Sequence, residues 1–242
     1  MAPARHIITA DDFGLDDAVN DAIAASFSAG LINSTSIMAG APGFESAIRI
    51  AREGKFLHAI GVHLNLTEGI ATTPGIASEP AFCDASGRFR FTLPRSALRL
   101  PRSRLEAIQA EFSRQIEICF KAGLVPTHLD SHHHVHNIWP LGALVIELAA
   151  RFRIPSVRIA RNIGPGIGPL KWIFKSAYNA RLRRHGVARS DLMGNVSDFI
   201  RVRPSPDLRA ELAVHPGFVG GIIVDREEKL PLEALLQRAR LR

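Results

Sequence analysis

The sequence of 242 residues lacks several features that would assign it to a familiar class. Two cysteines, Cys83 and Cys119, are too few for a disulfide scaffold and favour a reducing compartment. No apolar run precedes the first strand-like segment, so no secretory signal is expected. The longest uncharged run, residues 22–44, contains a proline and three glycines, and we interpret it as helix end, turn and strand. We therefore expect a cytoplasmic protein.

Nucleotide and nucleic-acid signatures are missing as well. No GxGxxG or Walker A pattern follows a strand-like segment. The net charge of +7 is uneven, because residues 151–209 hold 13 Lys and Arg against three acids, a local excess of ten. A nucleic-acid binder would be basic more uniformly, so no nucleic-acid partner is expected. The segment 151–209 is either a solvated basic face or a docking surface for an anionic substrate or a membrane surface.

Apolar patterns of strand type alternate with patterns of helix type along the chain, which predicts an α/β fold with a parallel sheet. Strands are predicted at residues 6–10, 34–39, 58–66, 126–131, 156–160, 198–202 and 211–215. Helices are predicted at residues 16–29, 44–52, 101–122, 140–152 and 169–184, with a short one near Pro231. Seven strands in one domain of residues 1–242 suit a TIM-like (β/α) barrel, closed or nearly closed, and a doubly wound open sheet is the alternative.

One long segment interrupts this alternation. Residues 67–100 are rich in glycine, proline and serine and hold at most a hairpin around residues 85–87. A long excursion directly after a strand is more typical of a functional loop than of a linker. We expect residues 67–100 to form a loop or lid over the substrate.

Acidic and imidazole side chains gather at the ends of four predicted strands, where active groups lie in parallel α/β folds. Asp11 and Asp12 follow the first strand, His63 lies in the third, and His215 closes the last. The segment 127–136, THLDSHHHVH, holds five of the ten histidines. Taken singly, the two aspartates could form a turn or helix cap, and His63 and His215 could be structural. Because all four strand ends carry acidic or imidazole side chains, a shared site is favoured.

The histidine segment is more difficult to explain structurally, since histidine is the commonest metal ligand. Side-chain alternation separates Asp130, His132 and His134 from Ser131 and His133, so not every imidazole can bind the same ion. Two imidazoles and one carboxylate suit Zn²⁺, Fe²⁺, Mn²⁺ or Co²⁺, and Mg²⁺ less well. Such an ion could activate water for hydrolysis of an amide, and His215 is placed by topology to protonate the departing amine.

Four segments in this order resemble one known family. ADDFG (10–14), GVHLNLTEG (61–69), THLDSHHHVH (127–136) and ELAVHPG (211–217) look like the YdjC-type carbohydrate deacetylases, which include chitooligosaccharide deacetylases and a hopanoid-biosynthesis branch. The resemblance extends over about residues 5–225 and implies a (β/α) barrel with a divalent metal, usually magnesium. It implies Asp12, His63 and His132 as ligands, Asp11 as general base and His215 as general acid. The chain departs from the family in its compact end after His215 and in Ala213.

The sequence and the resemblance together predict a metal-dependent enzyme that removes an N-acetyl group from an amino sugar, oligosaccharide or glycoconjugate. Asn65 and Arg158, near two strand ends, are predicted substrate contacts. The first alternative is another metal hydrolase on the same barrel, such as a glycosidase, which usually needs two carboxylates flanking the scissile bond. The second is a non-catalytic protein that binds polyanions or membranes through residues 151–209. A homodimer is the oligomeric form we consider besides the monomer.

Overall fold

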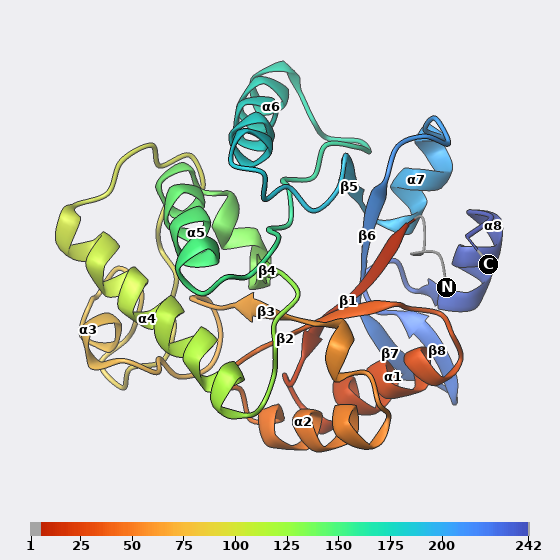
Figure 1. The fold of residues 1–242 in the computed structure, drawn as a ribbon, viewed down its shortest axis with the longest axis horizontal. Coiled ribbons are helices and arrows are strands. Elements are labelled where there is room, and N and C mark those ends of the chain that lie inside the picture. Colours follow the sequence, from red (N-terminus) through yellow and green to blue (C-terminus); the bar gives the residue numbers. More distant parts are fainter. Residues whose placement is uncertain (1–5, 242) are drawn as a thin grey trace.

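The structure, a computed structural model, describes residues 6–241 and has at its centre a parallel sheet of six strands. These strands are β1 (Ile7–Phe13), β2 (Ser34–Ile37), β3 (Ile60–Leu64), β4 (Leu129–Ser131), β5 (Leu192–Gly194) and β6 (Ala210–Val214). Their order is β4-β3-β2-β1-β6-β5, so the first strand of the chain lies in the middle. The sheet curls, and β5 and β6 run in a direction far from that of β3 (Figure 1). The predicted α/β class is confirmed.

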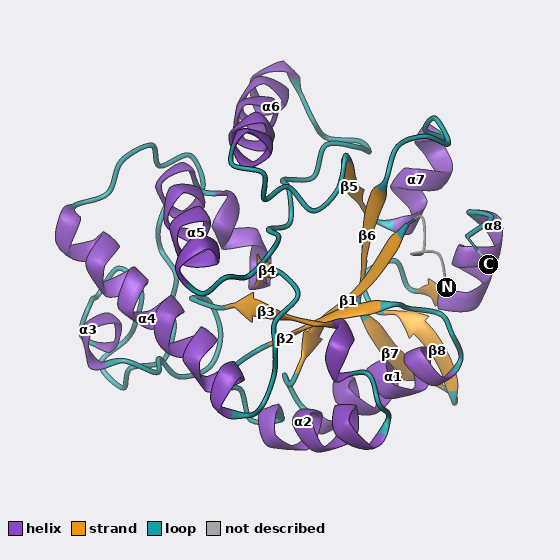
Figure 2. Cartoon of the chain, in the orientation of Figure 1, coloured by secondary structure: helices purple, strands orange, loops and turns teal. Residues whose placement is uncertain are grey.

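Helices lie around the outside of the strands (Figure 2). They are α1 (Asp17–Ser28), α2 (Phe44–Glu53), α3 (Pro74–Ala77), α4 (Arg102–Lys121), α5 (Trp139–Arg151), α6 (Pro169–Arg184), α7 (Val196–Val202) and α8 (Leu232–Arg238), with 3₁₀ turns η1 (Leu57–Ala59) and η2 (His132–Asn137). Apolar side chains of the helices and of the outer sheet face form one continuous core. Within residues 6–241, no helix is both long and apolar enough to cross a bilayer.

A second, antiparallel sheet of three short strands follows β6. It consists of β7 (Pro216–Val219), β8 (Ile222–Asp225) and β9 (Leu230–Pro231), in that order. The hairpin of β7 and β8 packs against α1 at the lower right of Figure 1. The sequence patterns did not predict this sheet, nor β5.

The predicted seventh strand of the barrel is not confirmed. Val157 makes single parallel bridges to Leu129 and to Ala188 and belongs to no strand. Backbone hydrogen bonds join this segment to Leu129 of β4 through Ser156 and Arg158, and to Met193 of β5 through Asn162. The six-stranded sheet is thus a curled half-barrel whose two edge strands are connected by an irregular segment and not by a seventh strand.

The strand predicted at residues 198–202 is wrong, since these residues lie in α7. The side chain of Asn195 accepts a hydrogen bond from the Asp198 backbone N–H, and the Asp198 side chain accepts one from the Asn195 N–H. This reciprocal capping box satisfies two backbone donors that the first helical turn leaves without partners. A local polar signal therefore outweighs the apolar alternation that favoured a strand.

The inner face of the curled sheet is polar although it is buried. Thr9 Oγ1 donates to Glu211 Oε1 across β1 and β6, and Ser36 Oγ lies 2.9 Å from His63 Nδ1 across β2 and β3. Alternate residues of a strand point to opposite faces, so the apolar residues between them contact the helices. The fold thereby places a column of polar side chains inside the sheet.

Candidate active site

Asp11 and Asp12 both point into the interior of the sheet because β1 is irregular at this position. The register between β1 and β2 shifts between Ala10 and Phe13, and Asp12 has a left-handed φ of +71°. In a regular strand the two carboxylates would point to opposite faces. Left-handed backbone is unfavourable for residues other than glycine, and strained positions of this kind cluster at active sites. The strain at Asp12 therefore places two neighbouring carboxylates in one site.

His63 and His132 meet the carboxylate of Asp12. His63 Nε2 lies 3.5 Å and His132 Nδ1 lies 2.9 Å from Asp12 Oδ1. All three side chains are buried, and one potential ligand atom of each lies within 4.8 Å of the others. The structure thus brings together the three residues that the family resemblance implies as metal ligands.

Residues that the sequence did not single out hold these three in place. His63 Nδ1 donates to Asp130 Oδ1 at 2.8 Å, which follows from the parallel register that pairs the two residues across β3 and β4. Arg226 Nη2 donates to Asp12 Oδ2 at 2.9 Å. His132 Nε2 lies 2.9 Å from Glu68 Oε2 in the long loop. A carboxylate on one nitrogen of an imidazole fixes the ring so that the other nitrogen faces a ligand.

The histidine segment does not continue as a strand, so the predicted alternation ends at Ser131. His133 and His134 have left-handed φ values of +51° and +54°, and the segment 132–137 is the 3₁₀ turn η2. His132 faces Asp12, whereas His133 is exposed, with Nδ1 2.9 Å from Thr67 Oγ1. His134 Nδ1 and His136 Nε2 are buried without a hydrogen-bond partner. One histidine of η2 therefore joins the acidic cluster.

Arg158 lies beneath the cluster and is completely buried. Its Nη1 and Nη2 donate to the two carboxylate oxygens of Asp11 at 2.7 and 2.8 Å, and its Nε donates to Glu211 Oε1 at 2.9 Å. Nη2 also forms an ion pair with Asp130 Oδ2 at 2.8 Å. The predicted contact between Arg158 and substrate is therefore not supported, because three buried carboxylates already surround the guanidinium.

The side chain of Asn65 is also engaged in hydrogen bonds, in this case to the backbone of the residues that follow it. Its Oδ1 accepts from the backbone N–H groups of Thr67 and Glu68, and its Nδ2 donates to the Glu68 carbonyl. The side chain thus closes a tight turn that carries Glu68 toward His132. The geometry supports a positioning role for Asn65 in place of the predicted substrate contact.

His215 follows β6 and is held by the small antiparallel sheet. Its backbone N–H donates to Asp225 Oδ2 at 2.9 Å, and its carbonyl accepts from the Arg226 N–H at 2.8 Å. The imidazole Nε2 lies 3.9 Å from Asp11 Oδ2, and Nδ1 lies 3.6 Å from Glu227 Oε2. The proposed acid and base of the sequence analysis are therefore neighbours at the carboxyl ends of β1 and β6.

The surroundings determine the charge of these groups. Burial alone would raise the pKa of Asp11, but the attraction of Arg158 and of His63 outweighs it and lowers the pKa below its usual value. For Asp12, hydrogen bonds from His132 and His63 likewise outweigh burial and lower the pKa. Burial lowers the pKa of His63, yet Asp130 and Asp12 raise it to about 10 in the absence of a cation. Both neighbouring carboxylates are thus ionised at neutral pH.

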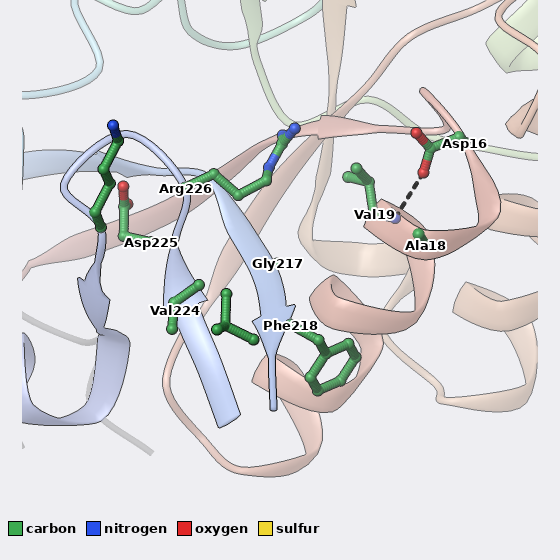
Figure 3. Close-up of a pocket in the computed structure, with 10 residues that line it drawn as sticks. Asp16, Ala18, Val19, Gly217, Phe218, Val224, Asp225 and Arg226 are labelled. Atoms are coloured by element: carbon green, nitrogen blue, oxygen red, sulfur yellow. Dashed lines mark hydrogen bonds between the residues drawn. The ribbon is translucent and has the colours of Figure 1, made fainter. Parts of the chain in front are cut away.

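Two cavities are lined by neighbours of the cluster, Arg226 in one and His134 in the other, although Asp12, His63 and His132 line neither. One of about 680 Å³ lies between α1 and the β7–β8 hairpin, and Arg226 extends over it in Figure 3. The other, also about 680 Å³, lies between η2, α6 and the long loop and has His134 in its wall. The long loop is fastened beside the second cavity, because Arg95 Nη1 donates to the His133 carbonyl. Both openings are large enough for groups of the size of a sugar.

The protein is an α/β protein with a curled parallel sheet. Carboxylates and imidazoles gather at the carboxyl ends of its strands, in an arrangement that could hold a metal ion. The chain matches the model of the YdjC-like protein family over residues 5–239 and belongs to that family. The family suggested by the four sequence segments is thereby confirmed.

Several similar proteins are carbohydrate deacetylases. That of Geobacillus stearothermophilus is 38% identical over 164 residues, covering 66% of this chain and 62% of the relative. That of Oceanobacillus iheyensis is 32% identical over 214 residues, 88% of this chain and 85% of the relative. A solved structure of an Enterococcus faecalis V583 protein, named for cellobiose-phosphate cleavage, has a TM-score of 0.70 and 23% identity and covers 96% of this chain and 94% of its own. That identity supports the shared fold alone.

Glu68, Asp130, Glu211 and Arg226 are the site residues that sequence reasoning missed. Asp130 could have been found, because it lies in the histidine segment and the end of β4 must align with the end of β3. Glu68 lies within the GVHLNLTEG segment, but no spacing indicates its contact with His132. Arg226 is 214 residues from Asp12 and lies in a sheet that was not predicted. Its role carries no sequence signal of its own.

Proposed function

We propose that this protein hydrolyses the acetamide group of an N-acetylated amino sugar, free or within an oligosaccharide or glycoconjugate. The observation that carries the proposal is the buried cluster of Asp12, His63 and His132, with Asp11 and His215 beside it. The similarity to proteins named carbohydrate deacetylases supports the choice of an acetylated carbohydrate. The matched segment covers 62% of the Geobacillus relative, so activity and substrate are inferences for this chain.

The residues of the cluster fit one divalent cation. Asp130 fixes Nδ1 of His63, which leaves Nε2 facing Asp12, and His132 presents a ring nitrogen to the same carboxylate. The family resemblance suggests Mg²⁺, whereas two imidazoles with one carboxylate are more typical of Zn²⁺ or another transition metal. When bound, such an ion polarises the amide carbonyl and lowers the pKa of a water molecule.

Asp11 then acts as the proton acceptor and His215 as the proton donor. Arg158 keeps Asp11 ionised and holds both of its oxygens in a fixed direction. Asp11 takes a proton from water as the oxygen attacks the acetamide carbon, and His215 gives a proton to the sugar nitrogen as the C–N bond breaks. The products are acetate and the free amine. The separation of 3.9 Å between Asp11 and His215 allows both groups to contact one tetrahedral carbon centre.

The long loop completes the proposed site. Residues 67–100 supply Glu68 to His132 and Arg95 to the back of η2, so the loop is fixed over the cluster at two points. We assign to it the role of a cover that contacts the sugar within the single domain of residues 1–242. The cytoplasmic location and the homodimer both remain predictions from the sequence.

Two measurements test the proposal. Acetylated mono-, oligo- and lipid-linked sugars are screened for acetate release with and without a chelator, and we expect release from at least one of them that the chelator abolishes. Elemental analysis of His63→Ala and His132→Ala should show loss of the divalent ion, whereas the matched control His133→Ala, in which the removed imidazole is exposed, should retain it. Full metal occupancy in both cluster variants would contradict the assignment of the ligands.

A further inference from the structure

The basic segment 151–209 does not form one basic face, because several of its cations are used inside the fold. Arg158 and Arg189 contact the buried carboxylate of Glu211, and Arg161 forms a bidentate pair with Asp198. The remaining positive charge is concentrated on α6, which has five Lys and Arg and no acidic residue. Helix α6 is therefore the part of this segment whose positive charge needs an explanation.

The first half of α6 exposes large apolar side chains. The exposed fractions of Leu170, Trp172 and Ile173 are 83%, 59% and 58%. The buried residues of this helix, Tyr178, Asn179 and Leu182, all lie in its second half. In Figure 1 α6 stands at the top of the molecule, away from the hairpin of β7 and β8. Adjacent exposed apolar side chains of this size mark an interaction surface.

The same half of α6 forms one wall of the cavity next to η2. Leu170 and Phe174 line it together with Leu98 and Ile138, and the cations that line it are Arg95, Lys171 and Lys175. No acidic residue is among its lining residues. His134 closes the cavity toward the candidate site, where it interacts electrostatically with Asp11 and His215. An apolar surface with only positive charge thus continues from α6 to the edge of the site.

We propose that residues 169–175 dock this protein onto an anionic lipid bilayer. Trp and long aliphatic side chains favour the boundary between headgroups and acyl chains, while Lys171 and Lys175 would contact anionic headgroups. A second copy of the chain is a poorer occupant. An interface with two-fold symmetry would bring the lysines of both copies together, and α6 offers no carboxylate to neutralise them. This docking is independent of the proposed deacetylase activity.

The test measures partition of the full chain onto vesicles. We expect cosedimentation with vesicles of mixed phosphatidylglycerol and phosphatidylcholine, weaker binding as salt increases, and no binding to phosphatidylcholine alone. Because the chain has two tryptophans, fluorescence that shifts to the blue on binding should vanish in Trp172→Phe if Trp172 is the one that inserts.

Two variants and a control locate the surface. Leu170→Ser/Trp172→Ser/Ile173→Ser should lower the partition coefficient by about tenfold or more, as expected for the loss of three large apolar groups. Lys171→Glu/Lys175→Gln should weaken binding to anionic vesicles selectively. The control Val219→Ser/Ile222→Ser removes apolar side chains of similar exposure, 66% and 57%, from the β7–β8 hairpin and should bind as the natural chain does.

Three results would overturn the proposal. They are absence of binding to the anionic vesicles, an equal loss in the hairpin control, and a dimer in solution that the triple variant dissociates while vesicle binding is absent. Unchanged melting temperatures show that the variants are folded. Acetate release from a water-soluble acetylated sugar is measured in parallel, so that failure of the deacetylase assignment and failure of docking remain distinguishable.

Discussion

Two groups of charged side chains lie next to each other inside the curled sheet, and their surroundings differ. In the arginine group, Arg158 contacts Asp11, Asp130 and Glu211, all buried. In the histidine group, Asp12 contacts His63 and His132 and accepts from Arg226 of the hairpin. His132 also contacts Glu68 of the long loop. The first group is enclosed by strands, whereas the second lies at their ends.

The difference indicates separate tasks for the two groups. In the arginine group each of the three carboxylates is already paired with the guanidinium of Arg158, so the group can fix side chains but has little capacity for a ligand. The histidine group presents a carboxylate and two imidazoles, and these are contacted by Glu68 of the long loop and Arg226 of the hairpin. Asp11 and Asp130 connect the groups, since Asp130 holds His63 and Asp11 adjoins His215. Variants on either side of this boundary should therefore fail in different ways.

The largest expected effect follows from Arg158→Met. The substitution removes the guanidinium that pairs with Asp11, while Asp130 keeps His63 and Glu211 keeps Arg189. Removal of one partner from a buried ion pair typically costs about 3–5 kcal/mol. We expect a loss of this size in the free energy of unfolding, measured by urea denaturation, together with loss of activity. The control Arg102→Met removes a pair with Glu106 in which both side chains are exposed, and it should cost about 1 kcal/mol or less. Equal losses of unfolding free energy in the two variants would mean that the arginine group contributes no more to stability than an exposed ion pair does.

The next largest effect separates Asp11 from Asp12. Asp11→Asn should retain the metal and lower the rate of acetate release by about 10²–10⁴-fold, the usual contribution of a proton-transfer group. Asp12→Asn removes the anionic ligand of the histidine group, so it should lose both metal and activity, and excess metal should partly restore the rate. Elemental analysis with steady-state kinetics checks both. Equal metal loss in the two variants would make Asp11 a ligand, and the base would have to be another residue.

Local signals in the sequence predicted most elements of this fold and part of the site. Helix α6 has the predicted bounds of residues 169–184, and α1 begins after Asp16, whose side chain caps it by accepting from the Val19 N–H. Strand ends at Asp12, His63 and His215 indicated one site because parallel strands end on the same side. These features depend on residues near one another in the chain.

The parts that the sequence could not predict depend on contacts between distant segments. The left-handed backbone of His133 and His134 ended the alternation that had been extended through the histidine segment. Arg158 lies within a predicted strand, yet its contacts to Asp11 and Glu211 depend on how β1 and β6 pair. The hydrogen bond from Arg226 to Asp12 requires the β7–β8 hairpin, which no apolar pattern revealed. Side-chain direction at the centre of a curled sheet is thus set by tertiary pairing.

A smaller effect concerns pH and the buried histidines. Burial and the charge of His134 lower the pKa of His136 from 6.5 to about 3. Between these values the unfolded chain binds more protons than the folded one, so stability is fully present above pH 6.5 and falls as pH decreases toward 3. At about pH 5 the loss due to His136 is about 2 kcal/mol.

Replacing this histidine should flatten the acid side of the stability curve. In His136→Phe the free energy of unfolding should depend less steeply on pH between about 5 and 7, whatever its absolute value. The exposed His185→Asn is the matched control and should keep the slope of the natural chain. Denaturation at a series of pH values measures both slopes. An unchanged slope in His136→Phe would show that other groups cause the acid instability.

The smallest effect concerns the long loop, which is fixed to the histidine group by Glu68 and to α4 by Glu111. The buried carboxylate of Glu111 accepts from Thr72 N–H, Thr72 Oγ1 and Thr73 Oγ1. In Glu111→Gln the amide oxygen is a weaker, neutral acceptor, and the amide N–H group faces hydroxyl oxygens. The loop should therefore be held less tightly. The residues of the arginine group and of the histidine group are all unchanged. We expect a KM higher by several-fold on the true substrate, with metal content and kcat nearly unchanged, because a cover that only contacts the sugar contributes binding energy shared by substrate and transition state. The control Glu106→Gln lies on the same helix and is paired, within residues 6–241, only with Arg102, so it should leave both constants unchanged. If kcat and metal content decreased together in Glu111→Gln, the loop would help to hold the metal through the contact of Glu68 with His132. The loop would then be part of the histidine group and not only a cover over the sugar.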